Sequence, residues 1–325
     1  MNTDCTNNTF DPCSSVFVRV LFALALMFLL VACGPASQPM RIVAMSSPTA
    51  LPTPTALPAP AATPAPADTP QPTATPAGWE RIADGAHIRR MVGRENERSG
   101  EVFAVRLDPA RFDVKLRYEP QRPRSIAAWF RDEQPIAALT AGFFDRDNTP
   151  VGLWVIDGVT YGRGYFRMQG EFRVSGAGVS IRRVTERYLS DGTRTLASLE
   201  SYPLLIAPGG FSDPCLGRGE RFSRFGEWCL PSRVPAERAL VGIDGAGFLV
   251  FLLVPSKTFT LIGLADWLQR SDLNLDVALN LDGGSSAGML VRAGAGVWGE
   301  DSRRDVPGAL IVVPKPSGLE GSEPP

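Results

Sequence analysis

The feature that most limits what this chain can fold into is a long stretch built from Pro, Ala, Thr and Ser. It runs from residue 34 to residue 77 and carries almost no charge. Such a composition buries too little apolar surface to form a core, and its prolines favour extended polyproline-like segments. We therefore expect a disordered stalk at 34–77, a plain spacer unless its Thr-Pro pairs carry sugars. One folded domain remains, at 78–314, followed by a polar tail at 315–325 that we also expect to be disordered.

An apolar segment precedes the stalk. It runs from Val20 to Ala32 after Arg19 and ends at Cys33, the arrangement of a secretory signal closed by a lipoprotein cleavage box. The alternative is a membrane-spanning helix, but such a helix needs about 20 apolar residues and this segment has fewer. We expect residues 1–33 to be a signal segment and Cys33 to be lipidated. The protein would then be exported and lipid-anchored to the outer face of the cell membrane or cell envelope.

Charge and histidine content exclude several classes of protein. The chain has 33 Lys and Arg residues against 34 Asp and Glu residues, so its overall charge attracts neither nucleic acid nor an anionic membrane. His87 is the only histidine, which argues against a Ser-His-Asp triad and against a multi-histidine zinc site. Any catalysis must then rely on carboxylates, and we expect no cofactor, no metal and no nucleic-acid partner.

Two cysteines of the folded part bracket a Gly- and Arg-rich loop. They are Cys215 and Cys229, and export would bring them to a compartment where disulfides persist. The loop between them has little apolar content of its own to hold it in place. We expect the two to form a disulfide, with two free thiols as the alternative.

Short apolar runs bounded by Gly, Pro or Asp indicate many strands and few helices. Helices are expected at 125–131 and at 260–270, where the apolar positions share one face and Thr260 or Thr258 is the cap. The pattern favours an α+β fold: a single sheet-rich domain with a mixed or antiparallel sheet. The clearest strands are expected at 102–107, 112–118, 151–156, 240–243, 248–254, 277–281 and 310–313.

An acidic residue stands where the apolar run 277–281 ends. Asp282 begins the segment Asp282-Gly283-Gly284-Ser285-Ser286. This puts a carboxylate beside backbone N–H groups and hydroxyls that can hold an anion. The Gly-Lys-Ser/Thr of a nucleotide-binding P-loop is missing. Taken alone, the segment is a plain glycine turn as readily as a site.

Further motifs along the chain form an ordered series with this segment. The series resembles the phosphodiester glycosidase family over about 90–314, and the resemblance implies a hydrolase of sugar-phosphodiester or related cell-envelope glycosidic linkages. The family usually has Asn where Thr140 stands. The motifs are Leu139-Thr140-Ala141-Gly142-Phe143-Phe144-Asp145, Thr149-Pro150-Val151-Gly152-Leu153 with Asp157-Gly158, Tyr202-Pro203-Leu204-Leu205 with Gly209-Gly210, Glu237-Arg238-Ala239-Leu240-Val241-Gly242-Ile243, the Asp282 segment, and Arg304-Asp305-Val306-Pro307.

The resemblance also implies roles for individual residues. Asp282 would be the central catalytic carboxylate and Asp145 the second acid. Arg238 and Arg304 would grip the phosphate of the substrate, a carbohydrate or sugar phosphate. The remaining expected substrate-binding residues are Gly283, Gly284, Ser285, Ser286, Thr140 and Phe144.

Each assignment has a structural alternative. Asp282 could bond its own backbone in a turn, Arg238 could pair with Glu237, and Arg304 could be a solvated charge beside Arg303. At the level of the whole protein, the alternative is a non-catalytic envelope lipoprotein that binds a glycan or phosphopolymer, a reading motivated by Thr140.

Three acidic positions have other expected roles. Asp145 and Asp147 with Asn148 hint at a cation site, but the glycine and distal glutamate of a calcium loop are missing. Asp244 reads as the turn of a hairpin between 240–243 and 248–254.

The lipid anchor can be tested at one position. Replacing Cys33 with serine removes the thiol that would be acylated, so the precursor should stay uncleaved by the lipoprotein peptidase and carry no lipid. Intact-mass measurement of the membrane fraction checks this. A Cys33→Ser protein that is still processed and lipid-modified would contradict the assignment.

Overall fold

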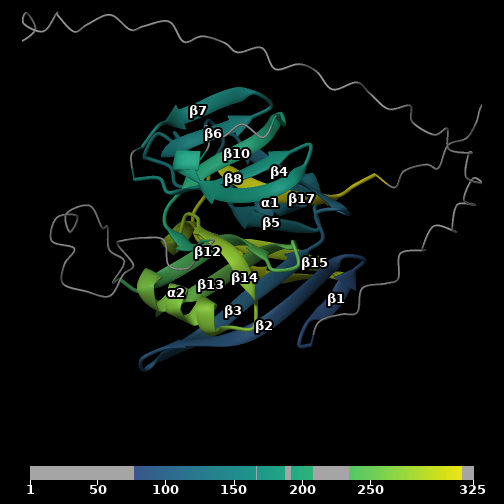
Figure 1. Ribbon diagram of the computed structural model, residues 1–325, viewed down its shortest axis with the longest axis vertical. Coiled ribbons are helices and arrows are strands. Elements are labelled where there is room, and N and C mark those ends of the chain that lie inside the picture. The colour runs from purple at the N-terminus through teal and green to yellow at the C-terminus, as the bar shows by residue number, and fades with distance from the viewer. Residues whose placement is uncertain (1–76, 166, 187–191, 208–233, 317–325) are drawn as a thin grey trace, which may run out of the picture. The chain divides into compact units, whose positions relative to one another are not determined.

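The computed structural model describes residues 77–165, 167–186, 192–207 and 234–316, and their strands form three sheets (Figure 1). Every pairing between named strands is antiparallel. Cys33, Cys215 and Cys229 lie outside the described residues, so lipidation and the disulfide stay predictions.

The first sheet has seven strands in the order β1-β2-β3-β13-β12-β14-β11. Its strands are β1 (Glu80–Ala83), β2 (Ala86–Glu95), β3 (Arg98–Leu107), β11 (Leu204–Ile206), β12 (Ala236–Asp244), β13 (Leu249–Phe259) and β14 (Leu275–Asn280).

The second and third sheets have five strands each, in the orders β7-β6-β10-β8-β9 and β16-β15-β5-β17-β4. The second contains β6 (Gly152–Ile156), β7 (Val159–Arg163), β8 (Gly170–Ser175), β9 (Gly178–Arg183) and β10 (Thr195–Ser201). The third contains β4 (Phe112–Tyr118), β5 (Ala137–Thr140), β15 (Met289–Ala293), β16 (Gly296–Glu300) and β17 (Gly308–Pro314).

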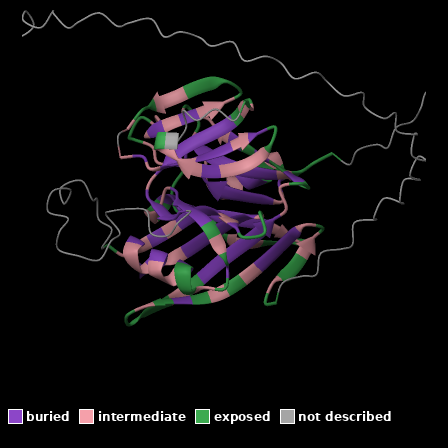
Figure 2. Ribbon diagram, viewed as in Figure 1, coloured by how far each residue is buried: buried purple, intermediate pink, exposed green. Residues whose placement is uncertain are grey.

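The central strands of the first sheet are buried on both faces (Figure 2). In β13, Leu249 and Phe251 point into a core shared with the other sheets, whereas Val250 and Leu252 point to the opposite face. A strand covered on both sides needs apolar residues at consecutive positions, because successive side chains point to opposite faces. This explains why the run reads as continuously apolar rather than alternating.

Helix α2 (Leu261–Arg270) covers the outer face of the first sheet. It begins at Thr260, whose hydroxyl accepts the N–H of Gly263 at 2.9 Å, so Thr260 rather than Thr258 is the cap. Its apolar stripe packs against Leu252 and Ala278. The stripe consists of Leu261, Leu264, Ala265 and Leu268.

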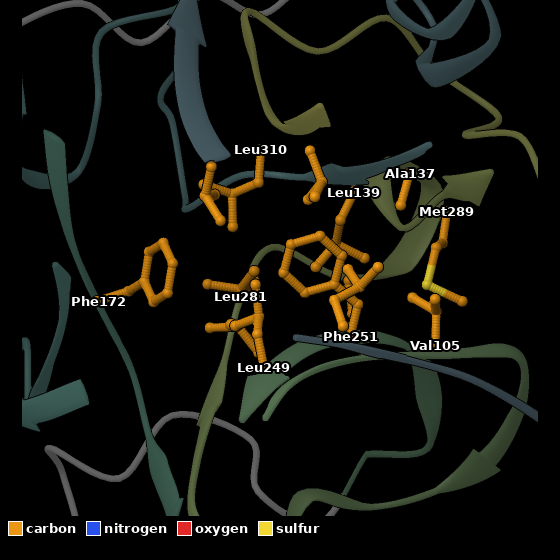
Figure 3. Close-up of a cluster of buried hydrophobic side chains, with 14 of the residues drawn as sticks. Val105, Ala137, Leu139, Phe172, Leu249, Phe251, Leu281, Met289 and Leu310 are labelled. Atoms are coloured by element: carbon orange, nitrogen blue, oxygen red, sulfur yellow. The ribbon is translucent and has the colours of Figure 1, made fainter. Parts of the chain in front are cut away.

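The main core joins all three sheets (Figure 3). Phe251 of the first sheet, Phe172 of the second and Leu310 of the third belong to one buried cluster. Leu281, directly after β14, lies in the same cluster and has no exposed surface. Each fully buried side chain of this size contributes about 1.5–3 kcal/mol to folding, so this cluster fixes how the sheets meet.

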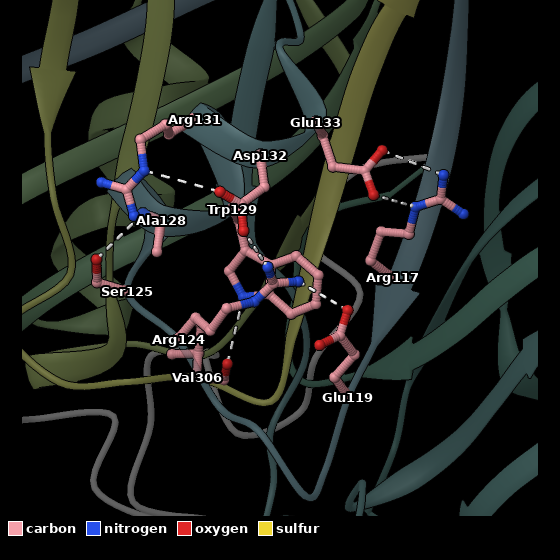
Figure 4. A network of polar contacts seen from close by, with 10 residues as sticks. All are labelled: Arg117, Glu119, Arg124, Ser125, Ala128, Trp129, Arg131, Asp132, Glu133 and Val306. Carbon is pink, nitrogen blue, oxygen red and sulfur yellow. Dashed lines mark hydrogen bonds and ion pairs between the residues drawn. The ribbon is translucent and has the colours of Figure 1, made fainter.

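Helix α1 (Ile126–Glu133) covers the outer face of the third sheet and is tied to it by an arginine (Figure 4). Arg124 pairs with Glu119 at 2.7 Å and with Asp132 at 2.6 Å, and its guanidinium lies 3.7 Å from the centre of the Trp129 ring. The Trp129 indole N–H donates to the carbonyl of Val306 at 3.3 Å. Helix, preceding loop and sheet are therefore held by one polar network.

The α+β, sheet-rich fold expected from the sequence is confirmed. Both expected helices are present, Ser125 caps α1 through the N–H of Ala128, and the expected strands coincide with β3, β4, β6, β12, β13, β14 and β17. The turn at Asp244 is also present, with one carboxylate oxygen accepting from Ala246 and Phe248. The remaining strands were not named individually, because most of them mix polar and apolar residues and the apolar β11 is only three residues long. In the described part, neither helix is long and apolar enough to cross a bilayer.

A buried polar cluster lies at one end of the first sheet. Arg106 of β3 pairs with Asp244 at 2.5 Å and its guanidinium lies 3.4 Å from the centre of the Phe248 ring. His87 of β2 is directly opposite Arg106, is 6% exposed, and its Nδ1 makes no hydrogen bond within the described residues. Burial, together with the charges of Arg106 and Arg81, lowers the pKa of His87 below 6.5, with Asp84 opposing the shift.

This cluster predicts a pH dependence of stability. His87 binds a proton less readily in the folded protein than in the unfolded chain, so the free energy of unfolding should fall as the pH drops below about 6.5. His87→Gln removes this titration and should make the decline between pH 7 and pH 5 shallower. Urea unfolding at several pH values measures both slopes, and identical slopes would contradict the assignment.

Candidate active site

Asp282 lies at the end of β14, where the first and third sheets meet. The N–H of Leu281 donates to the carbonyl of Ala239 on β12, at 2.9 Å. The next N–H, that of Asp282, donates to the carbonyl of Ala141 just after β5, at 3.2 Å. Consecutive residues therefore bond to two different sheets, and the Asp282 side chain is held at their junction.

The turn after Asp282 requires its glycines. Gly284 has φ near 60°, a conformation that side chains with a Cβ rarely adopt. A Cβ on Gly283 would lie 2.8 Å from the carbonyl oxygen of Glu237, closer than real contacts allow. The N–H of Gly283 donates to the Asp282 carboxylate at 2.8 Å. The turn therefore lets backbone from β12 approach closely while it orients the acid.

Thr140 holds the same turn through two hydrogen bonds. Its hydroxyl donates to the carbonyl of Ser286 at 2.5 Å, and its N–H donates to the carbonyl of Gly288 at 3.0 Å. Thr140 is 1% exposed and Ser286 is 3% exposed. The contacts of Thr140 therefore organise the turn, while Ser285 is the exposed hydroxyl of the pair.

Arg304 reaches the site from the loop between β16 and β17. Its backbone N–H donates to the carbonyl of Ser285 at 3.1 Å, and its guanidinium lies 4.8 Å from the centre of the Phe144 ring. Within the described residues the guanidinium has no hydrogen bond or ion pair, and the residue is exposed. It is a free cation beside Asp282.

Arg238 lies on the β12 side of the turn. Its Nη2 donates to the carbonyl of Val234 at 2.9 Å, while its Nε is buried and unpartnered among the described residues. A Cβ built on Gly283 would be 3.8 Å from its Nη1, so the guanidinium lies beside the turn. Burial lowers the pKa of Arg238, and Glu237 and Glu95 oppose that shift.

The environment of Asp282 favours the protonated acid more than water does. Burial raises the pKa of Asp282 from 3.8 to about 6. The Ser286 hydroxyl, the Gly283 N–H and the charge of Arg304 each favour the ionised form and limit the rise. A perturbed carboxylate beside an unpaired cation is typical of a functional site.

Asp145 is exposed and shapes a different turn. Its carboxylate accepts the N–H of Asp147 at 3.3 Å and that of Thr149 at 3.1 Å. No hydrogen bond or ion pair joins Asp145 to Asp282 in the described part of the chain. The structure thus brings together Asp282, Arg238, Arg304 and the Gly/Ser turn, with Asp145 following Phe144 at the edge.

No metal-binding group of three or more His, Cys, Asp or Glu side chains is found among the described residues.

One pair at the site was missed in the sequence. Glu237 is bound by Arg303 rather than Arg238, through a short contact between its Oε1 and the arginine Nη2. The doublets Glu237-Arg238 and Arg303-Arg304 were the only signal of this in the sequence, and neighbours along the chain made the wrong pairing the simplest one.

Comparisons with known proteins identify the family of this chain. The phosphodiester glycosidase family model matches residues 133–313, more than half of the chain, a range that includes every expected catalytic and substrate-binding residue. No curated protein matches the sequence.

Two solved structures resemble the fold. The catalytic domain of zebrafish N-acetylglucosamine-1-phosphodiester alpha-N-acetylglucosaminidase, auto-inhibited by its pro-peptide, is 17% identical, with a TM-score of 0.57 over 74% of this chain and 85% of that one. A hypothetical protein from Synechocystis is also 17% identical, with a TM-score of 0.48 over 74% of this chain and 64% of that one.

The raised pKa predicts that Asp282 lowers stability at neutral pH. A carboxylate whose folded pKa exceeds its unfolded value costs stability above the folded pKa, and this cost disappears as the pH falls below the unfolded value. Asp282→Asn should therefore stabilise the protein at pH 8, by at most about 3 kcal/mol for a rise from 3.8 to about 6. Denaturant unfolding at pH 8 and pH 4 measures the difference. Equal destabilisation at both pH values would show that the pKa of Asp282 is not raised in the folded protein.

Proposed function

Because the chain belongs to the phosphodiester glycosidase family, we propose that it hydrolyses the bond between a sugar and the phosphate of a sugar phosphodiester. The observation that carries the proposal is the partly buried carboxylate of Asp282 next to the guanidinium of Arg304, which has no partner among the described residues. The first group suits a developing positive charge and the second suits a phosphate.

Asp282 is the proposed catalytic carboxylate. Cleavage at the anomeric carbon passes through a state with oxocarbenium character, which a nearby negative charge stabilises. The bond from the anomeric carbon to the phosphate oxygen breaks, and water supplies the new hydroxyl and a proton. Asp282 acts in its ionised form, which predominates above its pKa of about 6.

The nature of the leaving group explains why the site does not need a general acid to protonate it. A phosphate monoester departs as a stable anion, so it needs charge neutralisation more than a proton. Arg304 is exposed and available to bind it, and Arg238 contributes positive charge from its position beside Gly283. Guanidinium groups bind two phosphate oxygens at once.

The other family positions have supporting roles in this proposal. Gly283, Gly284 and Ser285 line the turn beside the phosphate, and Phe144 lies under Arg304, where it limits the motion of that side chain. Asp145, exposed one residue further on, is proposed as the second acid.

We also propose that the enzyme is exported and held at the membrane by a lipid on Cys33. A sugar-phosphate polymer or glycoconjugate of the cell envelope would then be within reach of the stalk. A fully extended polyproline-like chain spans about 3 Å per residue, enough to keep the domain clear of the bilayer.

The catalytic assignment is tested by Asp282→Asn. The variant keeps the shape of the side chain and removes its charge, so turnover of sugar 1-phosphodiesters should fall by about 100-fold or more, mainly in kcat. For the parent protein, kcat/KM should rise as the pH increases through about 6, the pKa of Asp282. Steady-state rates of the purified protein, measured between pH 4.5 and pH 8, check both.

Two outcomes would redirect the proposal. Asp282→Asn turning over substrate as fast as the parent would return Asp282 to the role of an acid in a glycine turn. Binding of phosphodiester glycans without hydrolysis, in a screen that also includes ordinary glycosides, would instead support the non-catalytic binding protein.

A further inference from the structure

Glu237 is a buried carboxylate next to the site that has no part in the proposed chemistry. It lies on β12 between Ala236 and Arg238, where the pairing with β13 is interrupted by a bulge. Glu237 is 6% exposed, whereas the side chain of its partner Arg303 is 62% exposed. A long exposed arginine is normally mobile, so this ion pair restrains Arg303 at one point of the β12 strand.

The backbone around the pair closes a ring of three segments. The carbonyl of Glu237 lies against Gly283, where a Cβ would come within 2.8 Å. From the turn, the carbonyl of Ser285 accepts the N–H of Arg303 at 2.9 Å and that of Arg304 at 3.1 Å. The Arg303 side chain then returns to Glu237. Strand β12, the Gly/Ser turn and the loop before β17 are thus tied to one another.

The ring contains both groups of the proposed chemistry. Asp282 immediately precedes Gly283, and Arg304 immediately follows Arg303. Restraining Arg303 therefore restrains the backbone that carries Arg304, whose own guanidinium has no partner within the described residues. Arg304 also favours the ionised form of Asp282, so its position affects the carboxylate.

We propose that Glu237 and Arg303 are positioning residues, which together hold Arg304 next to Asp282. The inference rests on the proposed function of the site and adds to it two residues that contact neither the sugar nor the phosphate. Their ion pair acts through the loop that carries Arg304. Neither residue can hold Arg304 in place without the other, because only their ion pair restrains the loop.

A double-mutant cycle tests the pair. Glu237→Gln and Arg303→Gln should each lower kcat/KM by roughly 10- to 100-fold, the range for displacing a catalytic group by about an ångström. The double variant should be no worse than either single variant, because the second change removes nothing further. The acidic limb of kcat/KM should move to higher pH in all three, since Arg304 no longer favours ionised Asp282.

A matched control breaks an ion pair elsewhere. Asp272→Asn removes the contact between Asp272 and Arg89, which joins the α2 end to β2 at 2.9 Å and shares no residue with the site. This variant should keep the parent kcat/KM and the parent pH profile. Additive losses in the cycle would overturn the proposal, because they would show that the two residues act independently. A loss in Glu237→Gln with none in Arg303→Gln would also overturn it and would make Glu237 a group that acts on substrate directly.

A second measurement does not depend on turnover. Hydrogen–deuterium exchange of peptides covering 301–306 should be faster in Glu237→Gln and in Arg303→Gln, and unchanged in Asp272→Asn. Unchanged exchange in the first two variants would overturn the positioning role. A parent protein that cleaves no sugar phosphodiester, with the exchange result as expected, would contradict the proposed function alone.

Discussion

The burial of Leu281 is the constraint on which the candidate site depends. Leu281 belongs to the core shared by the three sheets and has no exposed surface. Its N–H is bonded to β12, and the N–H of the following Asp282 is bonded to the segment after β5. An apolar side chain anchored on one side and two sheets bonded on the other leave Asp282 only one location. The acid is placed by the core rather than by the loop in which it occurs.

That location has an energetic consequence. The core that anchors Leu281 also removes water from Asp282, and the pKa of the carboxyl rises to about 6. A carboxylate in this position is destabilising when ionised, so it must be held by neighbours that favour the charge. Gly283, Ser286 and Arg304 supply that stabilisation. Stability is given up at the residue that we propose as the catalytic carboxylate, a common trade at active sites.

Arginine serves two distinct purposes in this molecule. Arg106 is held by a buried carboxylate and Arg124 by two carboxylates closer to the surface, and both stack on aromatic rings, so they join structural elements. Arg304 has a ring below it but no carboxylate partner in the described part of the chain, and is open to a ligand. Arg303 belongs to the structural group although it adjoins Arg304. Composition alone cannot separate these uses, because the same side chain suits both.

Features that depend on residues close together in the chain could be predicted from the amino-acid sequence. The helix starting near Ser125, the cap at Thr260, the turn at Asp244 and the apolar runs that became β4 and β13 depend on residues close together in the chain, and they were predicted within a few positions. The Asp282 segment was also visible, because a glycine turn after a strand is a short-range pattern, and the ordered series of motifs along the chain indicated the family. The sheet order, the antiparallel pairing of β12 with β14, and the pairing of Glu237 with Arg303 depend instead on residues far apart in the chain. Glu237 and Arg303 are 66 positions apart, and Phe112 of β4 pairs with Pro314 of β17. Contacts of that kind are decided by which side chains fill the common core, and that is settled only when the three sheets pack together.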